Sequence, residues 1–166
     1  ALDLESDLEK IRRRIRRGES KTLELKQTFS LDVKKSTKEK YIELSCLKTI
    51  VGFLNSDGGE LYVGVQDDGL ITGLDLEIEQ FYGGKQDNFL NHVKNRIKDR
   101  VGEQFYPFIN YKMVKVGESC HLLLVECKPA TKACFLDGTD FYVRTNPATD
   151  KLEGPKLVEY IQAKFG

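Results

Sequence analysis

The feature that most constrains this fold is a short strand held between two glycine-containing turns. Apolar side chains occupy every second position of residues 61–65, the period that is typical of a strand. Gly58-Gly59 precedes this strand and Asp68-Gly69 follows it, and both pairs favour tight turns because glycine tolerates positive φ. We therefore predict a helix end, a turn, a strand, a second turn and a short second strand over residues 51–74.

Two acidic residues, Asp67 and Asp68, lie where this strand reaches its turn. A carboxylate held there by rigid backbone and open to water suits a metal ligand or a general base. Asp-Gly is also common in ordinary hairpin turns. From this stretch alone, the ordinary turn is the favoured interpretation.

Length and charge limit the class of protein. A chain of 166 residues is long enough for one domain with a real core, and its 26 basic residues balance its 26 acidic ones. This balance argues against a strongly basic binder, although a local basic patch is enough to bind nucleic acid.

We expect a cytoplasmic protein with no membrane partner, because no apolar run has the length of a membrane span. Since the chain begins at Ala1 without Met, we expect further domains of a longer protein.

The four cysteines form no Cys-x-x-Cys pair, so no zinc finger is indicated. Three of them, Cys120, Cys127 and Cys134, lie in apolar segments that read as strands. His121 could join them as a ligand, but buried free thiols of a cytosolic protein are the favoured interpretation.

An amphipathic helix is predicted over residues 4–17, with an apolar stripe and five arginines on its other faces. Arg13, Arg16 and Arg17 are the candidates for phosphate contacts. A solvated face paired with nearby acids explains the same pattern equally well. Gly18 then suits the end of the helix.

A short strand is predicted over residues 22–26, with Glu24 and Lys26 on one face. Glu19 stands five residues before Glu24, so the two side chains of a continuous strand would point to opposite faces. They converge only if residues 18–21 form a turn.

The remaining segments alternate between predicted helices and strands. We expect a loop over 27–36 and then a helix to residue 54 that begins with a capping box at Ser36–Glu39. An irregular stretch over 75–86 precedes a helix over 87–101 that carries Lys94. Strands over 109–116 and 120–127, a hairpin over 133–144 that ends at Arg144, and an inward-facing helix over 155–165 complete the chain. The pattern predicts an α+β domain with a largely antiparallel sheet and interspersed helices. No phosphate-binding loop of the ATPase type occurs, so ATP is not expected as a cofactor.

The ordered motifs resemble the Schlafen AlbA-type domain, long labelled DNA-binding in bacteria and formerly called divergent AAA. The matching blocks are residues 19–26, 51–59, 61–69, 71–74 and 141–144. The resemblance implies a single lobe of that fold over residues 18–166, preceded by the basic helix of residues 1–17.

The resemblance also implies a functional role for three acidic residues. In the Schlafen ribonucleases, two glutamates and an aspartate form a metal-dependent nuclease site, and by position these map onto Glu19, Glu24 and Asp67. The resemblance thus implies Mg²⁺ or Mn²⁺ as cofactor, since both prefer hard oxygen ligands. Lys26 would contact the phosphate beside the metal. Those ribonucleases pair two lobes around RNA, so this chain would need a homodimer or another domain to build a comparable groove.

Three hypotheses follow. The first is a nucleic-acid-binding module, for RNA or DNA, of a larger regulatory or defence protein, using the basic residues named above, Lys94 and Arg144 included. The second is a metal-dependent endoribonuclease that uses Glu19, Glu24 and Asp67. The third is an interaction or oligomerisation domain. Convergence of the three acids favours the second, and scattering of the basic residues over different faces favours the third.

Overall fold

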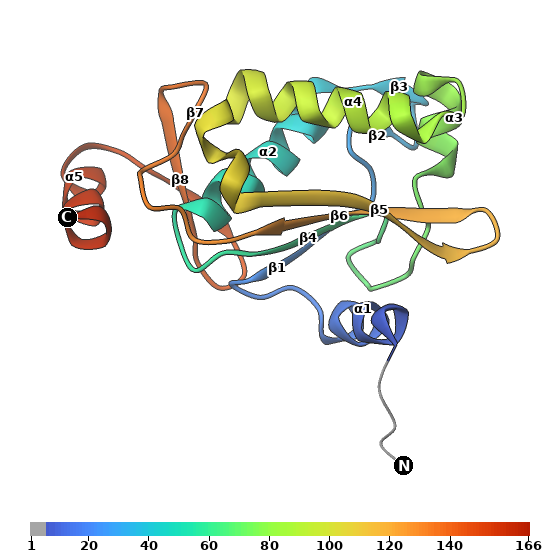
Figure 1. The fold of residues 1–166 in the computed structure, drawn as a ribbon, viewed down its shortest axis with the longest axis horizontal. Coiled ribbons are helices and arrows are strands. Elements are labelled where there is room, and N and C mark those ends of the chain that lie inside the picture. The colour runs from blue at the N-terminus through green and yellow to red at the C-terminus, as the bar shows by residue number, and fades with distance from the viewer. Residues whose placement is uncertain (1–5) are drawn as a thin grey trace, which may run out of the picture.

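The structure is a computed structural model that describes residues 6–166. Its centre is a four-stranded sheet. The strands lie in the order β1-β4-β6-β5 (Figure 1). Their bounds are Leu23–Lys26 for β1, Gly59–Val63 for β4, Cys120–Cys127 for β6 and Ile109–Gly117 for β5. β1 pairs with β4 in parallel, and the other two pairs are antiparallel.

Helices cover both faces of this sheet. Figure 1 shows α1 on one face and α2 and α4 on the opposite face. The bounds are Asp7–Arg17 for α1, Lys40–Leu54 for α2, Asp75–Tyr82 for α3 and Gln86–Arg96 for α4. A π-helical turn, Ile97–Val101, extends α4, and a 3-10 helix, Glu103–Phe108, leads into β5. No helix in residues 6–166 is both long enough and apolar enough to cross a membrane.

Two hydrophobic cores form because the central strands alternate their side chains between the faces. Leu61 and Val63 of β4 pack with α2 and α4, whereas Tyr62 packs with Ile11 and Ile15 of α1. The strands β4 and β6 are therefore buried on both sides. This explains why both read as nearly continuous apolar runs.

Two smaller sheets flank the centre. A hairpin joins β2 (Leu31–Asp32) to β3 (Thr37–Lys38), and a three-stranded sheet has the order β7-β8-β9. The bounds of this second sheet are Phe135–Leu136 for β7, Asp140–Arg144 for β8 and Thr149–Leu152 for β9. α2 approaches it closely at Gly52, where a Cβ atom would lie 3.2 Å from Cγ2 of Thr149. The chain continues into α5 (Gly154–Phe165).

The predicted α+β class is confirmed, as are the helix that ends at Leu54 and the hairpin at Asp137-Gly138. The N-terminal helix is present from Asp7, while residues 1–5, with the start of the predicted helix, lie outside the described residues. The predicted second strand of the central motif is not formed to its full extent. Residues 70–74 contribute only an isolated bridge between Val65 and Ile71.

Three other expectations are wrong. Residues 75–82 are helical rather than irregular, because Ile78 of α3 packs into the core. The capping box at Ser36–Glu39 does not form, since Thr37 and Lys38 pair with β2 and Glu39 makes no capping hydrogen bond. The predicted inward-facing helix exists as α5, but none of its residues is buried.

Candidate functional site

The two glutamates of the predicted triad meet at one backbone amide. The N–H of Leu25 lies 3.2 Å from Oε2 of Glu19 and 3.3 Å from Oε2 of Glu24. They meet because the chain turns before β1, where Ser20 and Leu23 form an isolated bridge. Glu19 and Glu24 therefore converge, as we expected if residues 18–21 form a turn. Glu19 is exposed, whereas only 8% of the surface of Glu24 is exposed.

The buried Glu24 is paired with Arg144, whose side chain is completely buried. Oε1 of Glu24 accepts a hydrogen bond from Nη1 of Arg144 at 3.2 Å. The other four guanidinium N–H groups donate to the carbonyl oxygens of Lys21, Ser20 and Leu23 and to the hydroxyl of Thr149. The guanidinium also lies over the ring of Phe53, with Cζ 4.9 Å from the centroid.

These surroundings do not support the predicted role of Arg144 in binding nucleic acid, and that role stays a prediction. A phosphate would have to displace partners that already use all five donors, in a place that solvent does not reach. Arg144 instead joins the end of β8 to the turn before β1. Its role in this structure is to hold these two segments together.

Asp67 does not join the two glutamates. In the parallel register Glu24 lies opposite Leu61, and Asp67 comes six positions later, beyond the end of β4. It lines a shallow pocket of about 460 Å³ with Gln27, Gln66 and Asp68. Asp68 accepts a hydrogen bond from the N–H of Leu70 at 3.0 Å, which identifies it as the turn residue of the ordinary interpretation.

The donor set for Mg²⁺ or Mn²⁺ is consequently incomplete. Within residues 6–166 no three His, Cys, Asp or Glu side chains are grouped so that they could hold a metal ion. One oxygen of Glu24 also faces the guanidinium of Arg144. The described residues therefore do not fit the implied metal.

The arginines of α1 divide into two groups. Arg12 donates to the carbonyl oxygen of Val116 at 2.7 Å, and Arg14 pairs with Glu60 at 3.3 Å. These two side chains hold the helix on the sheet. Arg13, Arg16 and Arg17 are exposed, as they were predicted to be.

The remaining basic candidates do not join that group. Lys94 is exposed on α4, which covers the face of the sheet opposite to α1 (Figure 1). Lys26 is half-buried at the end of β1, and its side chain points to the α2 side because it shares a strand face with Glu24. The predicted basic residues therefore do not form one surface, which is the arrangement that favours an interaction domain.

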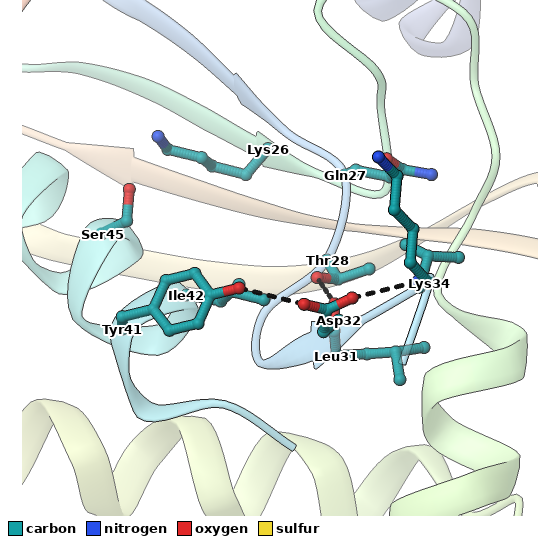
Figure 2. A pocket seen from close by; sticks show the side chains of 10 residues that line it. Lys26, Gln27, Thr28, Leu31, Asp32, Lys34, Tyr41, Ile42 and Ser45 are labelled. Atoms are coloured by element: carbon teal, nitrogen blue, oxygen red, sulfur yellow. Dashed lines mark hydrogen bonds between the residues drawn. The ribbon is translucent and has the colours of Figure 1, made fainter. Parts of the chain in front are cut away.

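Lys26 lines a pocket of about 590 Å³ that the sequence did not indicate. Figure 2 shows its wall, which comes from the end of β1, the β2–β3 hairpin and the first turns of α2. Its lining residues are Lys26, Gln27, Thr28, Leu31, Asp32, Val33, Lys34, Tyr41, Ile42 and Ser45. Segments 27–36 and 40–45 were predicted separately, so nothing in the sequence signalled that they would meet.

The motif at residues 55–59 also has a structural explanation. The side-chain amide of Asn55 donates to the carbonyl oxygens of Cys134 and Tyr142 and accepts from the N–H of Cys134. Ser56 accepts from the N–H of Arg144. Both side chains are buried, so this motif joins α2 to the β7–β8 hairpin.

Comparisons with known proteins agree with this fold. A family model described as "Schlafen, AlbA_2" matches residues 19–153, which leaves α1 and α5 outside the match. Among solved structures, the DIP2311 protein from Corynebacterium diphtheriae has a TM-score of 0.55 at 17% identity, over 88% of this chain. The chain spans 28% of the length of that protein, and at this identity the likeness concerns the fold alone. No curated protein has a matching sequence.

Proposed function

The chain belongs to the Schlafen AlbA_2 family, and from this premise we propose that it is a nucleic-acid-binding domain whose α1 arginines contact phosphates. The family is consistent with nucleic-acid binding in general. Because α1 lies outside the matched residues, the phosphate contact is proposed for this chain and not for the whole family.

The observation that carries the proposal is the exposed group Arg13, Arg16 and Arg17. Ile11 and Ile15 fix the opposite side of α1 in the core, so the helix cannot turn these arginines inward. In the described part of the chain Arg16 and Arg17 take part in no ion pair. Arginine is well suited to phosphate because its planar fork can donate two parallel hydrogen bonds.

A competing role for these arginines is stabilisation of α1 itself. Arg14, Arg16 and Arg17 stand in the last helical turn, where positive charge interacts favourably with the helix dipole. That contribution is about 0.3–1 kcal/mol per exposed charge. A binding test must therefore include a measurement of stability.

We expect the Arg16→Gln/Arg17→Gln double variant to bind a labelled single-stranded oligonucleotide more weakly than the wild type. Each lost phosphate contact should reduce the slope of log K against log salt concentration by about 0.7, because fewer counterions are released. Fluorescence anisotropy over a salt series measures both quantities. Thermal unfolding followed by circular dichroism checks that α1 stays folded.

The matched control is the Lys132→Gln/Lys156→Gln double variant, which removes the same charge from exposed lysines elsewhere. It should bind like the wild type with an unchanged slope. Equal losses in the two double variants would mean that only net charge matters. Absence of binding by the wild type would refute the proposal and favour the interaction domain.

The endoribonuclease remains a second candidate for one reason. Glu19 and Glu24 converge at the Leu25 amide, which provides two carboxylates of the implied three. The separate position of Asp67 weighs against it. Binding without assigned catalysis is the function we propose first, because the family and the exposed arginines of α1 both support it.

A further inference from the structure

The pocket beside Lys26 has the size and chemistry of a ligand site. Its volume of about 590 Å³ lies within the range of about 300–1,000 Å³ that small-molecule sites occupy. Leu31 and Ile42 supply apolar wall, while Gln27, Thr28 and Ser45 supply polar groups. Figure 2 shows Lys26 of β1 extending toward Ser45 above Tyr41 of α2, and Lys34 of the hairpin with its side chain beside Gln27.

Tyr41 is an aromatic ring that is held in place and still open to solvent. The residue is 59% exposed, although its hydroxyl donates to Oδ2 of Asp32 at 3.0 Å. Asp32 is itself fixed, since Oδ1 accepts hydrogen bonds from the N–H groups of Lys34 and Lys35, each at 3.0 Å. These backbone hydrogen bonds lower the pKa of Asp32, so the carboxylate stays charged and keeps its hold on Tyr41. The ring is therefore pre-oriented without being covered.

Two cations of the pocket have no partner in the described residues. The side chains of Lys26 and Lys34 form neither an ion pair nor a hydrogen bond there, and those of Gln27 and Ser45 form no hydrogen bond. Lys26 is half-buried and Lys34 is exposed. Together with the charge of Asp32, the two lysines leave the pocket with an excess of one positive charge. An anionic ligand would complement that charge.

We propose that this pocket takes one nucleotide of a single-stranded nucleic acid. The base stacks on the ring of Tyr41, the phosphate lies against Lys26, and Gln27 reaches the edge of the base. A paired duplex does not fit, because a base must be unstacked from its neighbours to lie on a protein ring. This inference rests on the proposed nucleic-acid function and adds the kind of strand and a place for one of its units.

This contact is separate from the one proposed for α1. The pocket lies on the α2 side of the sheet, whereas the α1 arginines lie on the other side. The two contacts can therefore be removed independently. Their combined loss should be roughly the product of the individual losses, since residues without shared partners behave additively.

The test is anisotropy of a fluorescein-labelled oligodeoxythymidine with the wild type and with pocket variants. Tyr41→Ala should weaken binding about 5- to 150-fold, the effect expected for loss of one stacked base, while Tyr41→Phe should keep most of the affinity because the ring remains. Lys26→Gln should reduce the salt slope by about 0.7, with Lys156→Gln as the control that leaves the slope unchanged. The nucleotide UMP should compete with the oligonucleotide for the wild type, and inorganic phosphate at the same concentration should not.

Each outcome decides a separate question. Loss with Tyr41→Ala and retention with Tyr41→Phe supports the stacking contact. Unchanged binding by Tyr41→Ala, equal loss in both Tyr41 variants, or equal competition by inorganic phosphate overturns the inference. If the wild type binds and only the α1 variant loses affinity, the pocket is wrong and the proposed function stands. If the wild type does not bind at all, both fail.

Discussion

At the scale of single residues, burial decides what a charged side chain can do. Arg144 and Arg16 have the same guanidinium group, yet the first is completely buried among five acceptors and the second is exposed. Arg144 donates hydrogen bonds to three carbonyl groups of residues 20–23, as well as to the carboxylate of Glu24. It belongs to the stability of the fold and not to recognition.

We therefore expect Arg144→Ala to destabilise the protein by about 3–5 kcal/mol, because it leaves Glu24 as a buried charge without its partner. Urea unfolding measures this change. Arg144→Lys should recover only part of the loss, since an ammonium group cannot reach five acceptors in the same geometry.

The matched control is Arg12→Ala, which removes one hydrogen bond of a less buried arginine and should cost about 0.5–1.5 kcal/mol. A variant Arg144→Ala as stable as the wild type, but defective in binding nucleic acid, would restore the sequence prediction for this residue.

At the scale of elements, strand pairing overrides local helix signals. Ser36–Glu39 has the letters of a capping box, but Thr37 pairs with Asp32 in the β2–β3 hairpin and Ser36 adopts a positive φ of 54° in its turn. The helix then begins at Lys40 instead. The pocket depends on this outcome, since the hairpin brings Asp32 and Lys34 to Tyr41.

A second connection between elements is sensitive to pH. Arg100 in the π-helical turn donates two hydrogen bonds to Asp137 of the β7–β8 turn, at 2.9 and 2.7 Å, and this pairing lowers the pKa of Asp137. A lowered pKa in the folded state means that the stabilisation is present above the ordinary pKa of about 3.9 and is lost as the pH falls through the lower folded value. Both side chains are partly exposed, so the contribution should stay below about 1 kcal/mol.

Asp137→Asn is the variant that tests this connection, because asparagine also tolerates the positive φ of 55° at this position. Denaturant unfolding should find the wild type more stable than the variant near neutral pH, and the difference should disappear in acid. A difference that stays constant down to acidic pH would show that the charge of Asp137 is not its source.

At the scale of the whole molecule, the parallel pairing of β1 with β4 separates the three acids. Glu19 and Glu24 lie near the beginning of β1, whereas Asp67 follows the opposite end of β4. Oxygen ligands lie about 2.0–2.6 Å from a shared ion. In residues 6–166 no three His, Cys, Asp or Glu side chains come together closely enough to hold one.

We therefore expect no Mn²⁺-dependent cleavage of labelled tRNA or single-stranded DNA by the wild type. Gel electrophoresis after incubation with the metal measures this, with a metal-dependent nuclease added to a parallel sample as the positive control. A metal-dependent cut that is lost in both Glu24→Gln and Asp67→Asn would instead establish the nuclease and require the three acids to rearrange.

The amino-acid sequence by itself determined the elements that depend on local patterns. The periodicity of residues 61–65 and 87–101, the turn at Asp137-Gly138 and the order of the family motifs predicted the class of fold, because side-chain period and turn chemistry act over a few neighbouring residues. The same reasoning predicted that Arg13, Arg16 and Arg17 are exposed, since Ile11 and Ile15 mark the buried stripe.

Only the tertiary structure decided which charged groups meet. Glu24 and Arg144 are 120 positions apart and become partners because β8 lies against the turn before β1. Tyr41 and Lys26 face one pocket because the β2–β3 hairpin folds back beside α2. Such contacts are fixed by long-range packing, which a pattern of neighbouring residues does not contain. The sequence therefore predicted most of the elements, and the fold decided which candidate residues lie close enough together to form a site.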